Sequence, residues 1–269
     1  MRLLVNKIVL GLSIFSALLG LGFLAWILIT LFMKGITSLH FSLFINDLID
    51  GGLRNLIVGQ FIMAGIASVI GIPLGMLAGI YIREYGNSSK FSNFIRNLSD
   101  IMMSAPSIVI GAFVYAIVVV PMHGTSGLAG SIALSIMMIP IVISTTDSML
   151  SLVPKELREA GIALGASKYK VIFDIIIKAA KVGIMTGILL AFARIIGETA
   201  PLLFTSQTSN YWTMDIIHGS FPSLTVSIYQ LANDVQESSR DLAWAASFIL
   251  TVLVLIFNLT GRYITRNKH

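Results

Sequence analysis

The chain contains 269 residues, of which 56% are hydrophobic and only 12% are charged, and its mean hydropathy is +0.89. Soluble domains carry about a quarter charged residues, so this composition is typical of an integral membrane protein. The absence of cysteine excludes a disulfide framework, a thiol nucleophile and a cysteine-based metal site. The net charge of +5 is confined to short segments between long apolar runs, which argues against a nucleic-acid partner.

Six apolar stretches are long enough, or nearly so, to cross a membrane, because about 20 helical residues span a hydrocarbon core of about 30 Å. The first stretch exceeds the roughly 7–15-residue core of a signal peptide, and no Ala-x-Ala site follows it, so we expect it to be retained. We predict an all-α integral membrane protein with a single transmembrane domain over residues 1–269. The predicted spans are residues 8–33, 55–82, 101–121, 128–146, 182–205 and 242–261.

The positive charges divide unevenly between the two sides of the membrane. Counted in alternate loops, fourteen lysines and arginines fall on one side and three on the other, while Arg194 lies inside the fifth span. Loops rich in lysine and arginine stay in the cytoplasm. We therefore expect a multi-pass protein with both termini in the cytoplasm.

Two further segments carry local signals. The second span has Gly71, Gly75 and Gly79 at four-residue intervals, which line one helix face and let another backbone approach closely. The polar residues 206–241 include several aromatic side chains. We expect them to form an outside loop that lies partly in the membrane interface, where aromatic residues are enriched.

The longest segment on the expected cytoplasmic side, residues 147–181, carries the signals of two short helices. Pro154 suits a first helical turn, and Glu159 places negative charge near the positive end of the helix dipole. Gly165 favours the left-handed conformation that ends a helix, and Ser167 is able to cap a second helix leading into the fifth span. One face of the first helix carries Leu157, Ala160, Gly161 and Leu164. Composition alone leaves open a plain amphipathic loop on the membrane surface.

This segment resembles the coupling loop of ATP-binding-cassette (ABC) importer permeases, which is known for its Glu-Ala-Ala sequence. The match covers residues 159–168, with glycine in the third position, where the family usually has alanine. A glycine inside a helix costs up to about 1 kcal/mol against alanine, so it loosens this turn without changing the assignment. By resemblance, the segment docks on a cytoplasmic ATPase. The residues to which this coupling role is assigned are Glu159, Ala160, Gly161, Gly165 and Ser167.

The fifth span carries a longer match, to the permeases of phosphate-specific ABC importers. Residues 194–199 read Arg-Ile-Ile-Gly-Glu-Thr, and that family shares an Arg-x-x-Gly-Glu-Thr pattern. Residues 200–205, Ala-Pro-Leu-Leu-Phe-Thr, resemble the A-type permease subunit in particular. Residues 105–111 of the third span, Ala-Pro-Ser-Ile-Val-Ile-Gly, resemble the same family. The resemblance assigns the substrate pathway and its gating to Arg194, Glu198 and Thr199.

The resemblance also implies the architecture and the partners. The expected fold is the six-helix bundle of type I (MetI-like) ABC importer permeases, in a bacterial or archaeal plasma membrane. The expected partners are a second, C-type permease, two ATP-binding subunits, an extracytoplasmic phosphate-binding protein and membrane lipid. No cofactor or metal is expected in this chain, because ATP and magnesium bind to the partner subunits. The implied function is import of inorganic phosphate by alternating access, with no enzymatic activity of its own.

The residue chemistry of the fifth span agrees with an anion pathway. A charged side chain at the centre of a bilayer is costly, so such residues usually face a cavity or a partner. Arg194 and Glu198 are one helical turn apart and are able to pair. The planar fork of arginine donates two parallel hydrogen bonds to an oxyanion such as phosphate. Two alternatives stay open: a purely structural ion pair, and a permease for another oxyanion such as sulfate or molybdate.

An enzyme is a more remote interpretation. Residues 124–127, Gly-Thr-Ser-Gly, fit the Gly-x-Ser-Gly pattern of intramembrane serine proteases, with Ser126 as the nucleophile. Such a protease needs a histidine near the serine, and none of the four histidines falls inside a predicted span. Neither an H-E-x-x-H motif nor a phosphate-binding Gly-x-x-x-x-Gly-Lys loop is present. We therefore expect neither proteolysis nor ATP hydrolysis by this chain.

Overall fold

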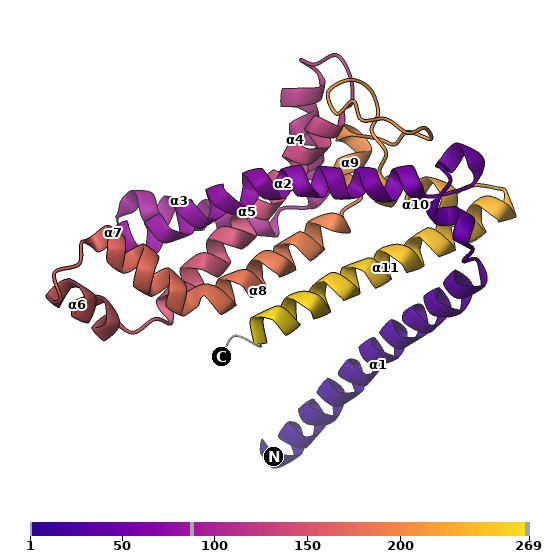
Figure 1. Ribbon diagram of the computed structural model, residues 1–269. Helices are drawn as coiled ribbons and strands as arrows, with labels where there is room; N and C mark the ends of the chain where they lie inside the picture. The colour runs from indigo at the N-terminus through magenta and orange to yellow at the C-terminus, as the bar shows by residue number, and fades with distance from the viewer. Residues whose placement is uncertain (1, 87–88, 267–269) are drawn as a thin grey trace.

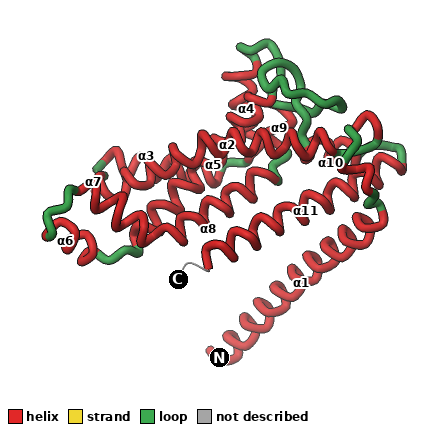
Figure 2. The backbone as a smooth tube through the Cα atoms, in the orientation of Figure 1, coloured by secondary structure: helices red, strands yellow, loops and turns green. Residues whose placement is uncertain are grey.

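The computed structural model describes residues 2–86 and 89–266, most of which are helical (Figures 1 and 2). Within these ranges, five helices are long and apolar enough to cross a membrane, and one bent pair of helices supplies a sixth crossing if it counts as one span. The long helices are α1 (Arg2–Thr37), α2 (Arg54–Ile80), α3 (Lys90–Ser104), α5 (Gly127–Ser151), α8 (Ile177–Ile196) and α11 (Glu237–Arg266).

Shorter helices connect or continue the long ones. They are α4 (Ser107–Val114), α6 (Lys155–Ala163), α7 (Lys168–Lys170), α9 (Ala200–Thr205) and α10 (Leu224–Ala232). Two 3₁₀ turns, η1 (Phe41–Phe44) and η2 (Leu48–Asp50), follow α1. Three π-helical turns are η3 (Tyr81–Tyr85) after α2, η4 (Tyr115–Val119) after α4, and η5 (Val171–Ile176) between α7 and α8.

Helices α2 and α5 lie side by side in the bundle, because three glycines of α2 let the two backbones approach closely. The contacts are Gly71 with Met138, Gly75 with Val142, and Gly79 with Thr146. A Cβ atom added to Gly75 would lie only 2.7 Å from the Cβ atom of Val142, so a larger residue would force the helices apart. The close approach predicted from the glycine spacing is confirmed.

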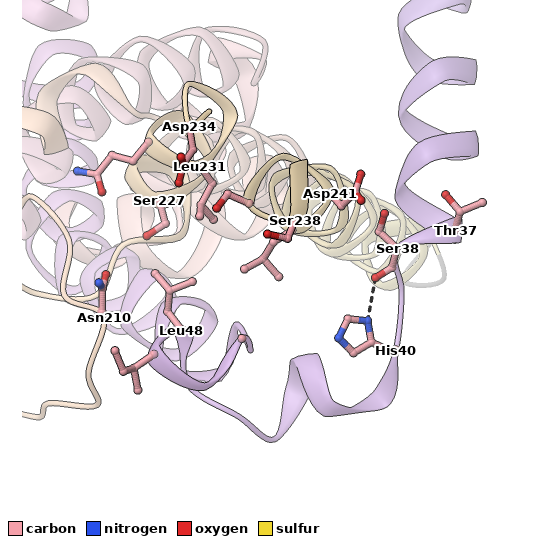
Figure 3. A pocket seen from close by; sticks show the side chains of 15 residues that line it. Thr37, Ser38, His40, Leu48, Asn210, Ser227, Leu231, Asp234, Ser238 and Asp241 are labelled. Atoms are coloured by element: carbon pink, nitrogen blue, oxygen red, sulfur yellow. Dashed lines mark hydrogen bonds between the residues drawn. The ribbon is translucent and has the colours of Figure 1, made fainter. Parts of the chain in front are cut away.

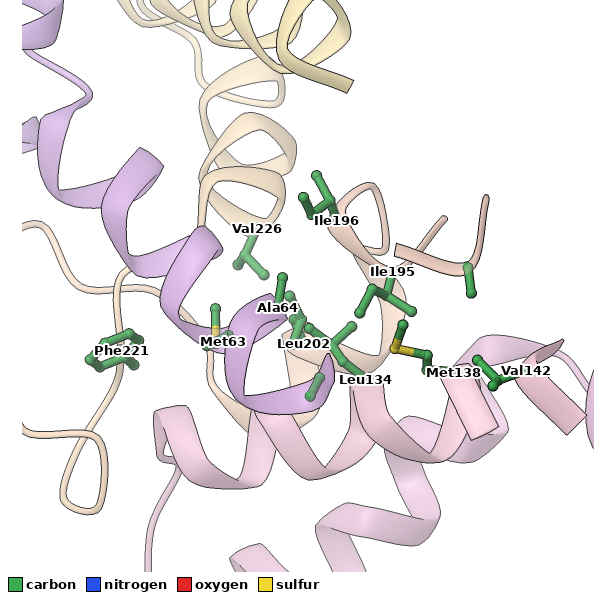
Figure 4. Packing of buried hydrophobic residues seen from close by; sticks show 12 residues of the cluster. Met63, Ala64, Leu134, Met138, Val142, Ile195, Ile196, Leu202, Phe221 and Val226 are labelled. Atoms are coloured by element: carbon green, nitrogen blue, oxygen red, sulfur yellow. The ribbon is translucent and has the colours of Figure 1, made fainter. Parts of the chain in front are cut away.

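An apolar core joins these two helices to the end of α8 and to α9 (Figure 4). Met63 of α2, Leu134 and Met138 of α5, Ile195 of α8 and Leu202 of α9 are all buried in it. In a membrane such contacts stabilise helix association through van der Waals packing rather than through exclusion of water. The core therefore fixes the end of α8, one residue from Arg194.

Helix α1 packs against α11 and diverges from the rest of the bundle (Figure 1). The two helices meet where Gly35 contacts Phe248, and the rings of Phe32 and Phe248 lie 5.6 Å apart between centroids. Along most of α1 the apolar side chains are exposed on all sides. A helix that is apolar all round is typical of one surrounded by lipid or by other transmembrane helices.

The third crossing differs from the uninterrupted helix predicted over residues 101–121. Helix α3 ends at Ser104, and the α4–η4 segment starts at Ser107 after a bend of 106°. Pro106 has no N–H to donate and disfavours a helical conformation in the residue before it, so Ala105 is extended, with φ −68° and ψ 138°. The proline signal was present in the sequence, but the apolar run concealed the interruption.

The fifth crossing, predicted over residues 182–205, is also interrupted. Helix α8 ends at Ile196 and α9 begins at Ala200, and residues 197–199 between them are here called the break. Because Pro201 has no N–H, it cannot donate to the carbonyl four residues earlier, that of Gly197. Helices α4 and α9 pack together across the long helices, and a Cβ atom on Gly111 would lie 2.6 Å from the Cα atom of Pro201. The two interrupted crossings thus meet.

Residues 206–241 form more than the outside loop predicted for them. They contain α10, whose first residues are buried and which packs against α11, α2 and α9. Phe221, one of the aromatic residues expected at an interface, is fully buried in the core (Figure 4). Polar residues that made this segment look like a loop, among them Ser223 and Thr225, have hydrogen-bond partners inside the protein, as described below.

Candidate functional site

Arg194 and Glu198 lie at the end of α8 and in the break, respectively, and form a loose ion pair. Their closest atoms, Arg194 Nε and Glu198 Oε1, are 3.6 Å apart. The arginine side chain is 53% exposed, whereas that of the glutamate is only 16% exposed. Among the described residues, no hydrogen bond engages the two terminal nitrogens of Arg194. The guanidinium group therefore keeps free donors toward the outside of this chain.

The inner side of Arg194 faces an apolar surface at the bend between α3 and α4. The arginine shares a small cavity of only about 10 Å³ with six residues, which are Met102, Met103, Ala105, Ile110, Met137 and Ile141. Such a space holds about one water at most, so no phosphate-sized anion fits there. An anion would reach Arg194 from its exposed side, and the bend in the third crossing forms the wall behind it.

Thr199 begins the turn into α9, next to the ion pair in the chain. Its carbonyl oxygen accepts the N–H of Leu203 at 3.2 Å, while its side chain makes no cap hydrogen bond. Its side chain is partly buried. The structure thus brings the side chains of Arg194 and Glu198 together and places Thr199 at the start of the adjoining helix, without a side-chain hydrogen bond to either.

The backbone carbonyls of the interrupted helix are bound by side chains that the sequence analysis did not single out. Gln60 of α2 donates from Nε2 to the Ile196 carbonyl oxygen at 3.0 Å, and Thr225 of α10 donates from Oγ1 to the Glu198 carbonyl oxygen at 2.8 Å. Both side chains are almost fully buried. The available signal was an amide side chain within the apolar second span, since buried polar groups need partners.

Residues 147–181, here called the coupling segment after the loop that they resemble, form the predicted helix–turn–helix. Gly165 has the left-handed φ of +82°, and the N–H groups of Gly165 and Ala166 donate to the carbonyls of Ile162 and Gly161, which closes α6. Ser167 Oγ accepts the Lys170 N–H at 3.4 Å and caps α7. The predicted conformations of Gly165 and Ser167 are confirmed.

Helix α6 packs against η5 through Gly161, while its apolar side chains are exposed to solvent. A Cβ atom on Gly161 would lie 2.9 Å from the side chains of Val171 and Ile175, so the glycine that departs from the usual Glu-Ala-Ala lets α6 approach η5. Ala160, beside it, is exposed. The side chains of Leu157 and Leu164 are also exposed, Leu164 by 88%. Exposed apolar groups of this kind are typical of an interaction surface.

Arg158 joins α6 to the ends of α2 and α5. Its guanidinium pairs with Glu84 at 2.8 Å, and that carboxylate is only 7% exposed. The same side chain donates to the carbonyl oxygens of Leu150 and Val153 at 2.8 and 2.6 Å. Removing one partner of a buried ion pair costs about 3–5 kcal/mol, so this contact holds α6 firmly on the bundle.

Comparison with known proteins identifies the family and the fold of the chain. Its residues 71–268 match the family described as binding-protein-dependent transport system inner membrane component. The chain belongs to this family of permeases. Solved structures agree on the fold: the MetNI methionine ABC transporter has a TM-score of 0.63 at 17% identity over 82% of this chain and 95% of that one. A bacterial ABC transporter for the polysaccharide alginate gives 0.66 at 13% identity over 92% and 93%. The MetI-like type I permease fold expected from the sequence is confirmed.

Curated relatives of the permease are more similar in sequence. The phosphate transport system permease protein PstA of Haemophilus influenzae is 46% identical over 98% of this chain and 94% of its own length. The protein of the same name from Yersinia pestis is 46% identical over 98% and 91%. A probable phosphate transport system permease protein PstA from Methanocaldococcus jannaschii is 35% identical over 97% and 94%. The family and the apolar helices together make the permease a multi-pass membrane protein.

The serine of the protease-like motif has a structural role in the permease. Ser126 is fully buried, and its Oγ accepts the Ala129 N–H at 3.1 Å, which caps the start of α5. A hydroxyl held in this way is not presented to a substrate. The Gly-Thr-Ser-Gly sequence is therefore the turn that leads into α5.

An open cavity of about 770 Å³ lies at the end of the permease opposite the coupling segment, between α1, α10 and α11 (Figure 3). Among its lining residues, His40 Nδ1 lies 3.0 Å from the Ser38 carbonyl oxygen. The backbone N–H of Gln236, and then the hydroxyl of Ser239, lower the pKa of Asp234. The lining carries carboxylates but neither lysine nor arginine. This cavity therefore suits an anion poorly.

Proposed function

We propose that this permease is the transmembrane subunit of an ATP-driven importer of inorganic phosphate. The observation that carries the proposal is the half-exposed guanidinium of Arg194, loosely held by Glu198 at an interruption of a membrane-spanning helix. The names of the relatives at 46% identity point to the same substrate. Charged residues in a membrane usually mark a substrate pathway, and non-helical backbone there occurs only where it is buried in protein or lines a water-filled cavity.

In the proposed mechanism, phosphate and the Glu198 carboxylate compete for the guanidinium group of Arg194. The Arg194 fork suits two oxygens of phosphate and stays charged at any working pH. Glu198 competes with the anion from 3.6 Å away, so the anion binds briefly rather than tightly. Thr199 adjoins the pair and supplies a hydroxyl to the same pathway. As two permeases rock between outward-open and inward-open states, this site opens first to one side of the membrane and then to the other.

The proposed assembly contains a second, C-type permease, two cytoplasmic ATP-binding subunits and an extracytoplasmic phosphate-binding protein, in contact with membrane lipid. ATP and magnesium bind to the ATPases, and the permease itself catalyses no reaction. The exposed apolar side chains of α6 support docking on an ATPase. The residues proposed to carry this docking are Glu159, Ala160, Gly161, Gly165 and Ser167.

The direct test is transport by the purified assembly. Co-purification in mild detergent is expected to recover the three kinds of partner subunit, and proteoliposomes containing the complex, with ATP and the binding protein supplied, are expected to accumulate radioactive phosphate. An excess of sulfate or molybdate is expected to leave that uptake unchanged. Uptake of sulfate or molybdate in preference to phosphate would instead assign the permease to another oxyanion.

The orientation is a separate prediction, motivated by the uneven distribution of lysine and arginine. This cysteine-free chain allows single cysteines to be placed at exposed positions, with Asn6→Cys near one terminus and Ser238→Cys just inside the start of α11. In intact cells an impermeant thiol reagent is expected to label Ser238→Cys, and to label Asn6→Cys only after the membrane is opened. Labelling of Asn6→Cys from outside would invert the topology and place α6 away from any cytoplasmic ATPase.

A further inference from the structure

Two backbone carbonyls, one at the end of α8 and one in the break of the fifth crossing, are bound by side chains of other helices. The oxygen of Ile196 accepts from Gln60 of α2, and the oxygen of Glu198 accepts from Thr225 of α10. An interruption of this kind exposes carbonyls that a membrane cannot hydrate, so it persists only where neighbouring groups satisfy them. The side chains of Gln60 and Thr225 are 1% and 2% exposed, so water does not compete for these bonds.

Gln60 also binds the segment that leads into α10. Its Oε1 atom accepts the Ser223 hydroxyl and the Leu224 N–H, both at 3.1 Å. Because the Leu224 N–H can only donate, it fixes which end of the Gln60 amide is oxygen, and hence which end donates to Ile196. One buried amide therefore ties α2, the end of α8 and the start of α10 to one another.

These contacts act on the ion pair through the backbone. The bound carbonyls belong to the second and the fourth residue after Arg194, so the path of the break between them is fixed. That path decides where the Glu198 carboxylate lies relative to the guanidinium, now 3.6 Å away. We propose that Gln60 and Thr225 are positioning residues of the anion pathway, which set the Arg194–Glu198 distance by holding the break. This inference rests on the proposed function as a phosphate importer.

A purely structural role predicts a different result. If the two hydrogen bonds only stabilise the bundle, their loss lowers the amount of assembled complex, while each assembled complex still moves the same amount of phosphate per ATP. If they position the pair, assembled complexes hydrolyse ATP but deliver less phosphate, because Arg194 no longer meets and releases the anion at the right point. The ratio of phosphate transported to ATP hydrolysed therefore separates the two roles.

Thr225→Val is the principal variant, because it removes the hydroxyl while keeping the shape of the side chain. In proteoliposomes with the whole complex and its binding protein, we expect the phosphate-to-ATP ratio to fall about tenfold, the effect of one buried hydrogen bond. Thr225→Ser keeps the hydroxyl and is expected to restore the ratio. The matched control is Thr146→Val, since Thr146 is equally buried and its hydroxyl has no hydrogen-bond partner among the described residues.

A second pair of variants tests Gln60 independently. Gln60→Met keeps the length of the side chain but removes both the donor and the acceptor, so its effect on the ratio is expected to exceed that of Thr225→Val. Gln236→Met makes the same change at an exposed position just before α11 and is expected to behave as the unmodified complex.

The outcomes distinguish this inference from the proposed function. If the unmodified complex moves no phosphate, the proposed function fails first. If it does move phosphate but Thr225→Val has the same ratio as Thr146→Val, the positioning role is wrong and the function stands. Failure of Thr225→Val to assemble, when Thr146→Val assembles, would also overturn the inference, because it would make the hydroxyl a folding determinant.

Discussion

Arg194→Lys is expected to reduce phosphate uptake about a hundredfold while the complex still assembles, because a hydrogen bond to a charged group is worth about 1.5–3 kcal/mol. Lysine keeps the charge but loses the planar two-pronged donor. Since the arginine is half exposed and only loosely paired, the substitution removes little packing. The measurement is uptake into proteoliposomes, normalised to the recovered complex.

Two double variants separate this role from a structural ion pair. Exchanging Arg194 and Glu198 preserves their attraction, and replacing both with leucine removes two charges that contribute little net stability. Neither is expected to transport phosphate, because the cation must lie at a particular point of the pathway. The matched control is an exchange of Lys178 and Asp174, an exposed pair four residues apart on the same chain segment, which is expected to be neutral. Robust uptake by the double leucine variant would leave the pair with a packing role only.

The variant Glu198→Gln tests whether Glu198 regulates the release of phosphate from Arg194. With the glutamate neutral, Arg194 has no competing anion, so bound phosphate is expected to leave more slowly. We therefore expect impaired uptake in an assembled complex, together with ATP hydrolysis that no longer depends on the binding protein. Normal uptake by this variant would show that Glu198 does not regulate release.

Gly165→Val is expected to weaken ATPase association by up to about a hundredfold, because a β-branched residue at positive φ is strained by about 1–3 kcal/mol. The φ of +82° ends α6 and turns the chain into α7, and no atom lies within 4 Å of the added Cβ, so the strain is in the backbone alone. Asparagine tolerates this conformation better, so Gly165→Asn is expected to retain most of the association. Binding of the purified ATPase to the permease is the measurement.

Gly219→Val is the matched control for this prediction. Gly219 also has a positive φ, of +78°, and also has open space around its Cβ position, but it lies outside the coupling segment. It is expected to reduce stability by a similar amount without reducing ATPase association. Equal loss of association in Gly165→Val and Gly219→Val would mean that general destabilisation, rather than the shape of the coupling turn, is responsible.

Local signals predicted the parts of this fold that depend on neighbouring residues. Gly165 and Ser167 end and begin helices by local hydrogen bonds, and Gly75 of α2 packs against α5 because the glycine spacing selects one helix face. The bend after Ala105 was recognisable from Pro106, but hydropathy averaged over a span conceals a single missing N–H. A long apolar run therefore predicts that a segment is able to cross the membrane, but not that its helix is uninterrupted.

The buried polar contacts could not be predicted in this way. Gln60 meets Leu224 across 164 positions of the chain, and no periodicity or motif encodes such a pairing. Ser223 and Thr225 are typical loop residues by composition, and only the partners Gln60 and Glu198 make their burial favourable. For the same reason the sequence showed that Arg194 and Glu198 were able to pair but not what holds them in place.

The Arg158–Glu84 contact gives α2 the geometry of a lever. Glu84 and Gln60 lie near opposite ends of a helix that continues through η3, about 36 Å apart at the usual helical rise. The contacts of Gly71, Gly75 and Gly79 with α5 support the middle of this arm. A tilt of only about 5° imposed at α6 would therefore displace the Gln60 end by about 3 Å, as long as a hydrogen bond. If an ATPase docks on α6 as proposed, small motions of that subunit would move the Gln60 end of α2 by the length of a hydrogen bond.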